Sequence, residues 1–168
     1  MSEWRKEDSV DMAEYRIEIT GITGPGPTVE VRSLFRRLYG EPQECGTTNP
    51  YLAEYRRLRV RLVPRFKSNQ GYSYVVGSVD YRYWPCLKLG YIENARVSSE
   101  IRRRGLGVKL INFAVNYMHR QGSHHIYAFA VNPEGYSLLA SAGFVHEPPE
   151  NPASPWRRWF FYNIGQTN

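Results

Sequence analysis

The chain has 168 residues, enough for one domain with a hydrophobic core and too short for two ordinary domains. Apolar residues make up 42% of it, which argues against a disordered chain, and no apolar run approaches the ~20 residues that span a bilayer. The formal net charge is +6, from 22 Lys+Arg against 16 Asp+Glu, so the surface attracts anions such as nucleotides, nucleic acids or acidic proteins.

The N-terminal stretch and the two cysteines bear on the cellular compartment. Residues 1–13 are charged and contain no apolar signal region, so we expect a flexible segment that does not direct secretion. We expect Cys45 and Cys86 to be reduced thiols in a cytoplasmic protein. Two cysteines do not make a zinc site, and no histidine spacing adds ligands, so no metal is expected. Residues 14–168 are expected to form a single domain.

The first half of the chain predicts one helix among four strands. A strand at residues 15–20 precedes a break rich in glycine and proline. A helix then runs from Thr28 to Gly40, because apolar residues recur at i, i+3, i+4 and i+7. After a loop-like stretch, an arginine-rich strand alternates charged and apolar residues, which is more typical of an amphipathic edge strand than of a nucleic-acid surface. This strand and the two after it are predicted at about residues 57–66, 72–84 and 87–97.

The second half predicts two further helices. The first begins at Gly105 and has a broad apolar face, so we expect it to be buried. Residues 125–131 are apolar on both faces, which is typical of a central strand. Asn132 is a predicted cap for a short helix that ends at Gly143, and two more strands follow. The resulting order, β, α, three β, α, β, α, β, β, indicates a mixed α/β layer fold.

The segment "VSSEIRRRGLGVKL" places three arginines and two glycines at a predicted helix start. The first turn of a helix has free N–H groups and a partial positive charge, so it favours a phosphate. Gly105 and Gly107 lack the Cβ atoms that would keep a pyrophosphate away from those amides. A solvated arginine run on an ordinary helix start explains "RRRGLG" alone equally well. Neither the lysine-bearing P-loop nor the three-glycine dinucleotide fingerprint is present.

The wider sequence separates these two interpretations. "Arg-x-x-Gly-x-Gly" at Arg102–Gly107 resembles the acyl-CoA signature of the GNAT superfamily of N-acetyltransferases, whose longer form "V-x-x-E-x-R-x-R-G-L-G" is matched from Val97. "VNPEGYSLLASAGF" resembles the second family signature, and the element order is similar over roughly residues 15–164. The resemblance implies an α/β (α+β) fold with a mostly antiparallel sheet of about six or seven strands, flanked by helices. The fourth and fifth strands are expected to splay apart.

The resemblance also implies that the cofactor is acetyl-CoA, with its pantetheine arm in the gap between the splayed strands. The backbone of Arg96 and Val97 would pair with that arm, and Asn132 would contact it. The amides that follow Arg102 would hold the pyrophosphate. The residues implied in cofactor binding are Arg96, Val97, Arg102, Arg103, Arg104, Gly105, Leu106, Gly107, Val108 and Asn132.

The implied reaction is direct attack of a neutral amine on the thioester within a ternary complex, which requires a general base. Glu93 lies four residues before Val97, so strand alternation predicts that both lie on one face, together with Tyr91. We expect Glu93 to be the base. A carboxylate with a surface or structural role is the alternative.

The general acid is a departure from the family pattern. Many members have a "Leu-Tyr" pair before the "Gly-Phe", and its tyrosine protonates the leaving thiolate. Here the pair is Leu138-Leu139, and leucine has no proton to donate. Tyr136 lies three residues before Leu139 on the same predicted helix. Tyr136, a water molecule, or departure as the free thiolate are the three alternatives.

The net charge of the protein is the one sequence feature that bears on the identity of the amine acceptor. The +6 charge argues mildly against a polyamine or a histone-like tail, which would prefer an acidic cleft. One alternative is an enzyme of this fold that acts on nucleic acid, by Mom-like DNA base modification or by acetylation of aminoacyl-tRNA or a modified base. Another alternative is a non-catalytic nucleic-acid-binding module. No membrane partner is expected, and monomer and dimer are both compatible with the sequence.

Overall fold

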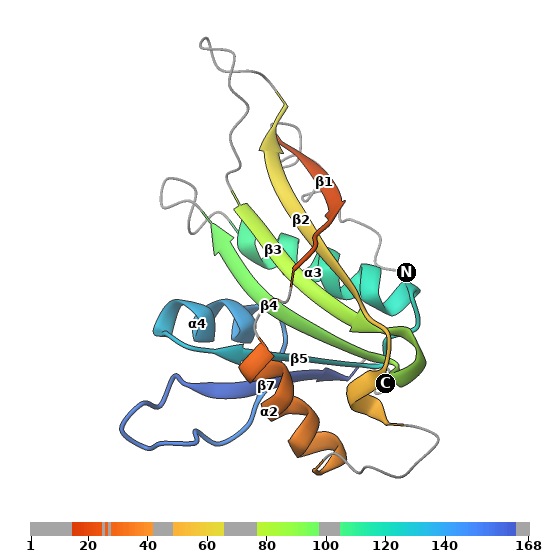
Figure 1. Ribbon diagram of the computed structural model, residues 1–168. Coiled ribbons are helices and arrows are strands. Elements are labelled where there is room, and N and C mark those ends of the chain that lie inside the picture. Colours follow the sequence, from red (N-terminus) through yellow and green to blue (C-terminus); the bar gives the residue numbers. More distant parts are fainter. Residues whose placement is uncertain are drawn as a thin grey trace.

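The computed structural model describes residues 15–24, 26, 28–41, 49–65, 77–97 and 105–163. Within these residues, one seven-stranded sheet has the strand order β1-β2-β3-β4-β5-β7-β6 and packs against helices α2, α3 and α4 (Figure 1). The predicted flexible segment 1–13 and Cys45 lie outside the described residues, whereas Cys86 is an exposed free thiol.

The elements follow the order predicted from the sequence. The strands are β1 (Tyr15–Gly21), β2 (Arg56–Pro64), β3 (Gly77–Trp84), β4 (Leu89–Val97), β5 (His125–Ala130), β6 (Val145–His146) and β7 (Arg158–Asn163). The helices are α2 (Thr28–Tyr39), α3 (Leu106–Arg120) and α4 (Pro133–Ser141), with short 3-10 turns at Pro50–Leu52 and Pro85–Leu87. The caps are local: Gly40 and Gly143 have positive φ, and the Asn132 side chain accepts a hydrogen bond from the N–H of Gly135.

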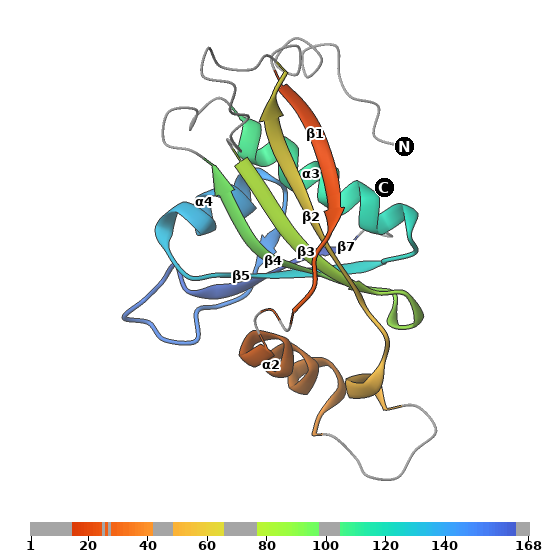
Figure 2. The ribbon, with the colours of Figure 1, turned by 45° about the horizontal axis from the view of Figure 1, so that its top comes forward.

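The two faces of the sheet are covered by different helices. On one face, α3 and α4 share a core with alternate residues of the strands, including Tyr81 and Tyr83 of β3. On the other face, α2 packs Leu34 and Phe35 against Trp84 of β3. Figures 1 and 2 show α3 crossing one side of the sheet while α2 lies on the other. None of the described helices has both the length and the apolar character needed to cross a bilayer.

The arginine-rich strand β2 is internal, so its prediction as an edge strand is wrong. It pairs with β1 on one side and with β3 on the other. Its apolar residues Val60 and Leu62 are buried in the core beneath α3. The arginines of its other face have carboxylate partners on nearby strands, in the pairs Arg57–Glu93, Arg59–Asp80 and Arg61–Glu18. These partners explain how an internal strand accommodates three arginines on one face.

The fourth and fifth strands splay apart, as predicted. The parallel pairing of β4 with β5 runs only from Leu89–His125 to Ile92–Ala128. Beyond that point β4 continues along β3 to Val97, and β5 continues along β7 to Ala130 (Figure 1). All other strand pairs are antiparallel. The mixed, mostly antiparallel fold is therefore confirmed, with a gap in the hydrogen-bond ladder between the carboxyl-terminal halves of β4 and β5.

Candidate functional site

Glu93 lies at the point where β4 leaves β5, and it interrupts the pairing of β4 with β3. Asp80 pairs with Asn94 and Tyr81 pairs with Ile92, so no residue of β3 is opposite Glu93. As a result, Ile92 and Ala95 are three residues apart and yet pack into the same core. Strict alternation would place those two on opposite faces. Strict alternation therefore does not continue from Glu93 to Val97, and it no longer supports placing the two residues on one face.

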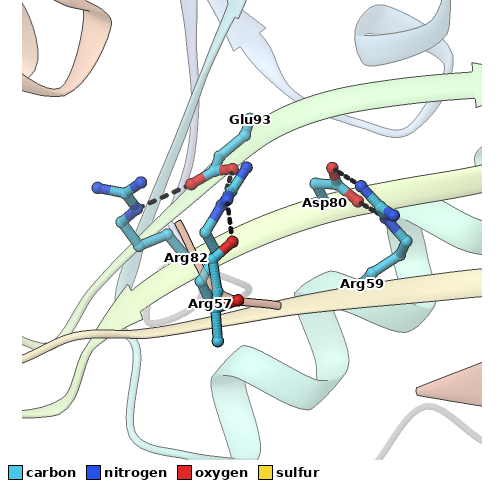
Figure 3. Close-up of polar contacts among 6 residues, drawn as sticks. Arg57, Arg59, Asp80, Arg82 and Glu93 are labelled. Atoms are coloured by element: carbon cyan, nitrogen blue, oxygen red, sulfur yellow. Dashed lines mark hydrogen bonds and ion pairs between the residues drawn. The ribbon is translucent and has the colours of Figure 1, made fainter. Parts of the chain in front are cut away.

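The carboxylate of Glu93 is buried between two guanidinium groups (Figure 3). Nε of Arg57 donates to Oε2 at 2.6 Å, and Nε of Arg82 donates to Oε1 at 2.8 Å. Only 1% of the Glu93 side chain is exposed, against 15% for Arg57 and 4% for Arg82. The three side chains of Glu93, Arg57 and Arg82 together carry a formal charge of +1. Each carboxylate oxygen retains lone-pair capacity for a further donor.

Described residues between β1 and α2 contact the arginines of this group. The N–H of Ile22 donates to the carbonyl oxygen of Arg57, and Nη1 of Arg57 contacts the carbonyl oxygen of Thr23 at 3.5 Å. Gly26 has a φ of 62° and lies against the guanidinium groups of Arg57 and Arg82, where a Cβ atom would have no room. This contact could not be predicted from local patterns, because its partners lie far apart in the chain.

Tyr91 lies on the α2 side of the sheet, two residues before Glu93. Its ring is 2% exposed and packs near Trp159, with ring centroids 6.2 Å apart. Burial raises the pKa of its phenol well above the usual value, and the negative charges of Glu30 and Glu93 raise it further while Arg82 lowers it. Tyr91 is therefore a neutral phenol at physiological pH, and its proposed catalytic role stays a prediction.

The start of α3 has the features expected of an anion-binding helix terminus. Gly105 occupies the cap position with φ 75° and offers no side-chain hydrogen bond to the helix. The first intrahelical bond runs from the N–H of Lys109 to the carbonyl oxygen of Gly105, so the N–H groups of Leu106, Gly107 and Val108 precede the ladder. A Cβ atom on Gly105 would point into open space. Arg102, Arg103 and Arg104 lie outside the described residues.

The carboxyl-terminal part of β4 has hydrogen-bonding capacity on the side toward β5. Arg96 and Val97 pair with Ser78 and Gly77 of β3. Within the described residues no strand pairs with their opposite edge. Such an edge presents N–H and C=O groups to whatever lies in the gap. This is the backbone that was predicted to pair with the pantetheine arm.

Helix α4 begins where β5 ends, so its first turn lies at the same open end of the strand pair. Oδ1 of Asn132 accepts from the N–H of Gly135 at 2.7 Å, which leaves the side-chain amide for a ligand. Tyr136 lies one turn later and is half-buried, with its ring 5.3 Å from that of Phe160. Leu139, at the position of the family tyrosine, is 5% exposed and belongs to the core.

Most of the described site residues predicted from the sequence lie at or beyond the point where β4 leaves β5, whereas Tyr91 pairs with Tyr127 inside the β4–β5 ladder. Glu93 lies where the strands part, β4 supplies an unpaired edge, and α3 and α4 begin beyond the two strand ends. Sequence reasoning missed Arg57 and Arg82, which hold Glu93, because the partners are separated by 36 and 11 residues along the chain. The alternating arginines of β2 were the available signal for the first of them.

The sequence and the structure resemble known proteins. Residues 29–144 match the model of the acetyltransferase (GNAT) family. The fold is similar to that of the ribosomal-protein-S5-alanine acetyltransferase from Vibrio fischeri, with a TM-score of 0.54 and 16% identity, covering 92% of this chain and 96% of that chain. It is also similar to Tetrahymena GCN5, with a TM-score of 0.52 and 14% identity over 89% of this chain and 96% of that chain.

A third similar structure is a domain from Methanocaldococcus jannaschii DSM 2661, with a TM-score of 0.54 and 15% identity, covering 90% of this chain and 100% of that chain. At such identities the structural likeness shows the fold alone. No curated protein sequence matches the chain.

Proposed function

Because the chain belongs to the acetyltransferase (GNAT) family, we propose that it transfers an acetyl group from acetyl-CoA to an amine. The observation that carries this proposal is the parting of β4 from β5 at Glu93, with α3 and α4 starting beyond the two strand ends. A gap lined by an unpaired strand edge and two helix N-termini suits an extended amide chain that ends in phosphates.

The residues at this gap fit coenzyme A in their donor chemistry. The amides of Leu106, Gly107 and Val108 would hold the pyrophosphate, and the space in front of Gly105 leaves room for it. Arg102, Arg103 and Arg104 would add positive charge beside it. The edge of β4 at Arg96 and Val97, with the side-chain amide of Asn132, would bind the pantetheine arm. Acetyl-CoA supplies the acetyl group as an activated thioester.

The protein would contribute alignment and proton transfer. Alignment of two bound reactants contributes up to ~7–11 kcal/mol when it is good. We assign the general base to Glu93, which would take the proton from the amine directly or through one water. Glu93 forms a β-bulge, because no residue of β3 lies opposite it. Arg57 and Arg82 hold its carboxylate in place there and leave lone pairs on both oxygens. Tyr136 is assigned as the proton donor to the leaving sulfur.

The alternatives that involve nucleic acid have less support. Arg57, Arg59 and Arg61 of β2 are engaged with carboxylates, so they do not form a free basic stripe for phosphates. An acceptor joined to a nucleotide stays compatible with the net charge of +6. A purely structural nucleic-acid-binding module would make no use of the gap between β4 and β5.

The proposal is tested by cofactor binding followed by turnover. Acetyl-CoA at about 100 times its dissociation constant would stabilise the native state by about 2.7 kcal/mol, measured as a rise in Tm. Adenosine, which lacks the pyrophosphate and the pantetheine arm, is the control and should give little shift. A thiol assay with a panel of amines then detects release of coenzyme A. No shift at saturating acetyl-CoA would remove the proposed function.

A further inference from the structure

A pocket of about 460 Å³ lies on the α2 side of the sheet, beside the Glu93 group. One face of α2 forms a wall, with Thr28, Val31, Arg32 and Phe35 spaced three and four residues apart. The 3-10 turn at Pro50–Leu52 and the residues after it form a second wall, and β3 forms the floor. The two walls and the floor come from distant parts of the chain.

The pocket is lined by aromatic rings. The ring of Phe35 lies 5.1 Å from Trp84 and 5.4 Å from Tyr51, measured between centroids. Tyr55 lies 6.0 Å from Trp84 and is 43% exposed. Phe35 and Trp84 are only 3% and 2% exposed, so Tyr55 offers most of the accessible aromatic surface on which a further flat ring could pack. The aromatic lining therefore favours a planar group over a flexible aliphatic chain.

The pocket is also positively charged. Arg32 and Arg82 both line it, and none of the described lining residues is acidic. Arg32 is exposed, and no carboxylate among the described residues pairs with it. The guanidinium of Arg82 lies 4.3 Å from the Tyr55 ring centroid and belongs to the group of net charge +1 around Glu93. Charge complementarity therefore selects an anion.

One side chain, Arg82, contacts both the pocket and the proposed general base Glu93. Arg82 lines the pocket, and its Nε donates to Oε1 of Glu93 at 2.8 Å (Figure 3). A ligand seated against Arg82 is thus one side chain away from the carboxylate assigned as base. Glu93 itself is not among the residues that line the pocket, so the amine of a bound acceptor would reach its carboxylate past the Arg82 side chain.

We propose that this pocket binds the far end of the acceptor, and that this end is an aromatic ring with a carboxylate or phosphate. The ring packs among Phe35, Tyr55 and Trp84, and the anion faces Arg32 and Arg82. The acceptor is therefore a small amine with an anionic aromatic tail. The inference rests on the proposed function for the fate of the amine, while the binding of the tail is a property of the pocket itself.

Calorimetry on the full chain without acetyl-CoA tests the pocket with matched probes. The first is 4-(aminomethyl)benzoate, and in the second, 4-(aminomethyl)benzamide, an uncharged amide replaces the carboxylate. The third, trans-4-(aminomethyl)cyclohexanecarboxylate, keeps the charges and removes the aromatic ring. The fourth, 4-(aminomethyl)phenyl phosphate, distinguishes a phosphate from a carboxylate source. We expect the benzoate or the phosphate to bind at least tenfold more tightly than the benzamide and the cyclohexane analogue.

Two variants on the same helix locate the binding. Arg32→Gln should weaken binding of the anionic aromatic probes about tenfold, which is about 1.4 kcal/mol. The affinity for the benzamide should not change. Arg36→Gln is the matched control, because Arg36 lies one turn later, pairs with Glu41 at 3.6 Å and does not line the pocket. Both arginines are exposed, so neither variant should lower Tm.

The outcomes separate this inference from the proposed function. Equal affinities for the benzoate, the phosphate and the benzamide, or no effect of Arg32→Gln, would overturn the pocket assignment. Tight binding of an anionic aromatic probe without acetyl transfer keeps the pocket and counts against the proposed function. A Tm shift with acetyl-CoA alongside no binding of any probe keeps the proposed function and overturns the pocket.

Discussion

Glu93 and Arg82 form an ion pair that is almost completely withdrawn from solvent, with Nε of Arg82 donating to Oε1 of Glu93 at 2.8 Å. The side chains are 1% and 4% exposed. Burial of two charges costs desolvation energy, and the pair recovers it only while both partners are present. Arg57 adds a second donor to the same carboxylate. The carboxylate is thus fixed at the bulge where β4 leaves β5.

The first prediction concerns the stability contributed by this pair. Glu93→Gln should lower the free energy of unfolding by about 3–5 kcal/mol, because it leaves two guanidinium groups without their counter-charge. Glu18→Gln is the matched control: Glu18 pairs with Arg61, both side chains are about one-third exposed, and the expected loss is below ~1 kcal/mol. Urea denaturation measures both. Equal losses would contradict a special role for the buried pair.

The bulge also shows which features the sequence could predict. Element order and helix caps depend on local patterns, so Asn132, Gly143 and the apolar stripes were sufficient to predict them. At the bulge, Glu93 has its partners in arginines of β2 and β3 that reach it across the sheet. Strand periodicity carries no information about such partners, so alternation failed at that residue. The pocket is formed by segments near residues 30, 52 and 83, and its shape depends on their packing.

The second prediction concerns Gly105. Its φ of 75° makes Gly105→Ala cost about 1–2 kcal/mol of stability. The new Cβ should also enter the space proposed for the pyrophosphate and reduce the Tm shift caused by acetyl-CoA. Gly122→Ala is the control, because Gly122 has a φ of 99° with open space around it at the other end of α3. The control should lose stability and keep the Tm shift caused by acetyl-CoA. If both variants keep that shift, the proposed pyrophosphate site at the start of α3 is contradicted.

The third prediction tests Tyr136 as the proton donor. Tyr136→Phe retains the ring contacts with Phe160 and His146, so stability should change by less than ~0.5 kcal/mol. Loss of a general acid lowers kcat by about 10²-fold or more. The measurement is kcat with an amine that turns over, together with the Tm shift caused by acetyl-CoA, which should be unchanged. An unaltered kcat would assign protonation to water, or departure to the free thiolate.

The fourth prediction concerns alkaline pH. Burial is the main cause that raises the pKa of Tyr81 and Tyr91 above the usual value near 10. Above pH 10 the unfolded chain releases these protons while the native state retains them. The unfolded state then binds fewer protons, so the free energy of unfolding falls as pH rises, by about 1.4 kcal/mol per pH unit for each tyrosine. Below pH 10 these groups should contribute no pH dependence.

Tyr81→Phe isolates one of these contributions. The hydroxyl of Tyr81 is buried and has no hydrogen-bond partner among the described residues, so its removal at pH 7 should be neutral or stabilising. Above pH 10 the variant should lose stability less steeply than the wild type, by about 1.4 kcal/mol per pH unit. Tyr91→Phe should reduce the slope of unfolding free energy against pH by a similar amount. The double variant should reduce it by the sum of the two, because the pKa of each phenol is raised mainly by its own burial. Urea denaturation at intervals from pH 8 to 11 measures these slopes. An unaltered slope in Tyr81→Phe would show that this phenol titrates equally in the native and unfolded states, and would contradict its burial as a neutral group.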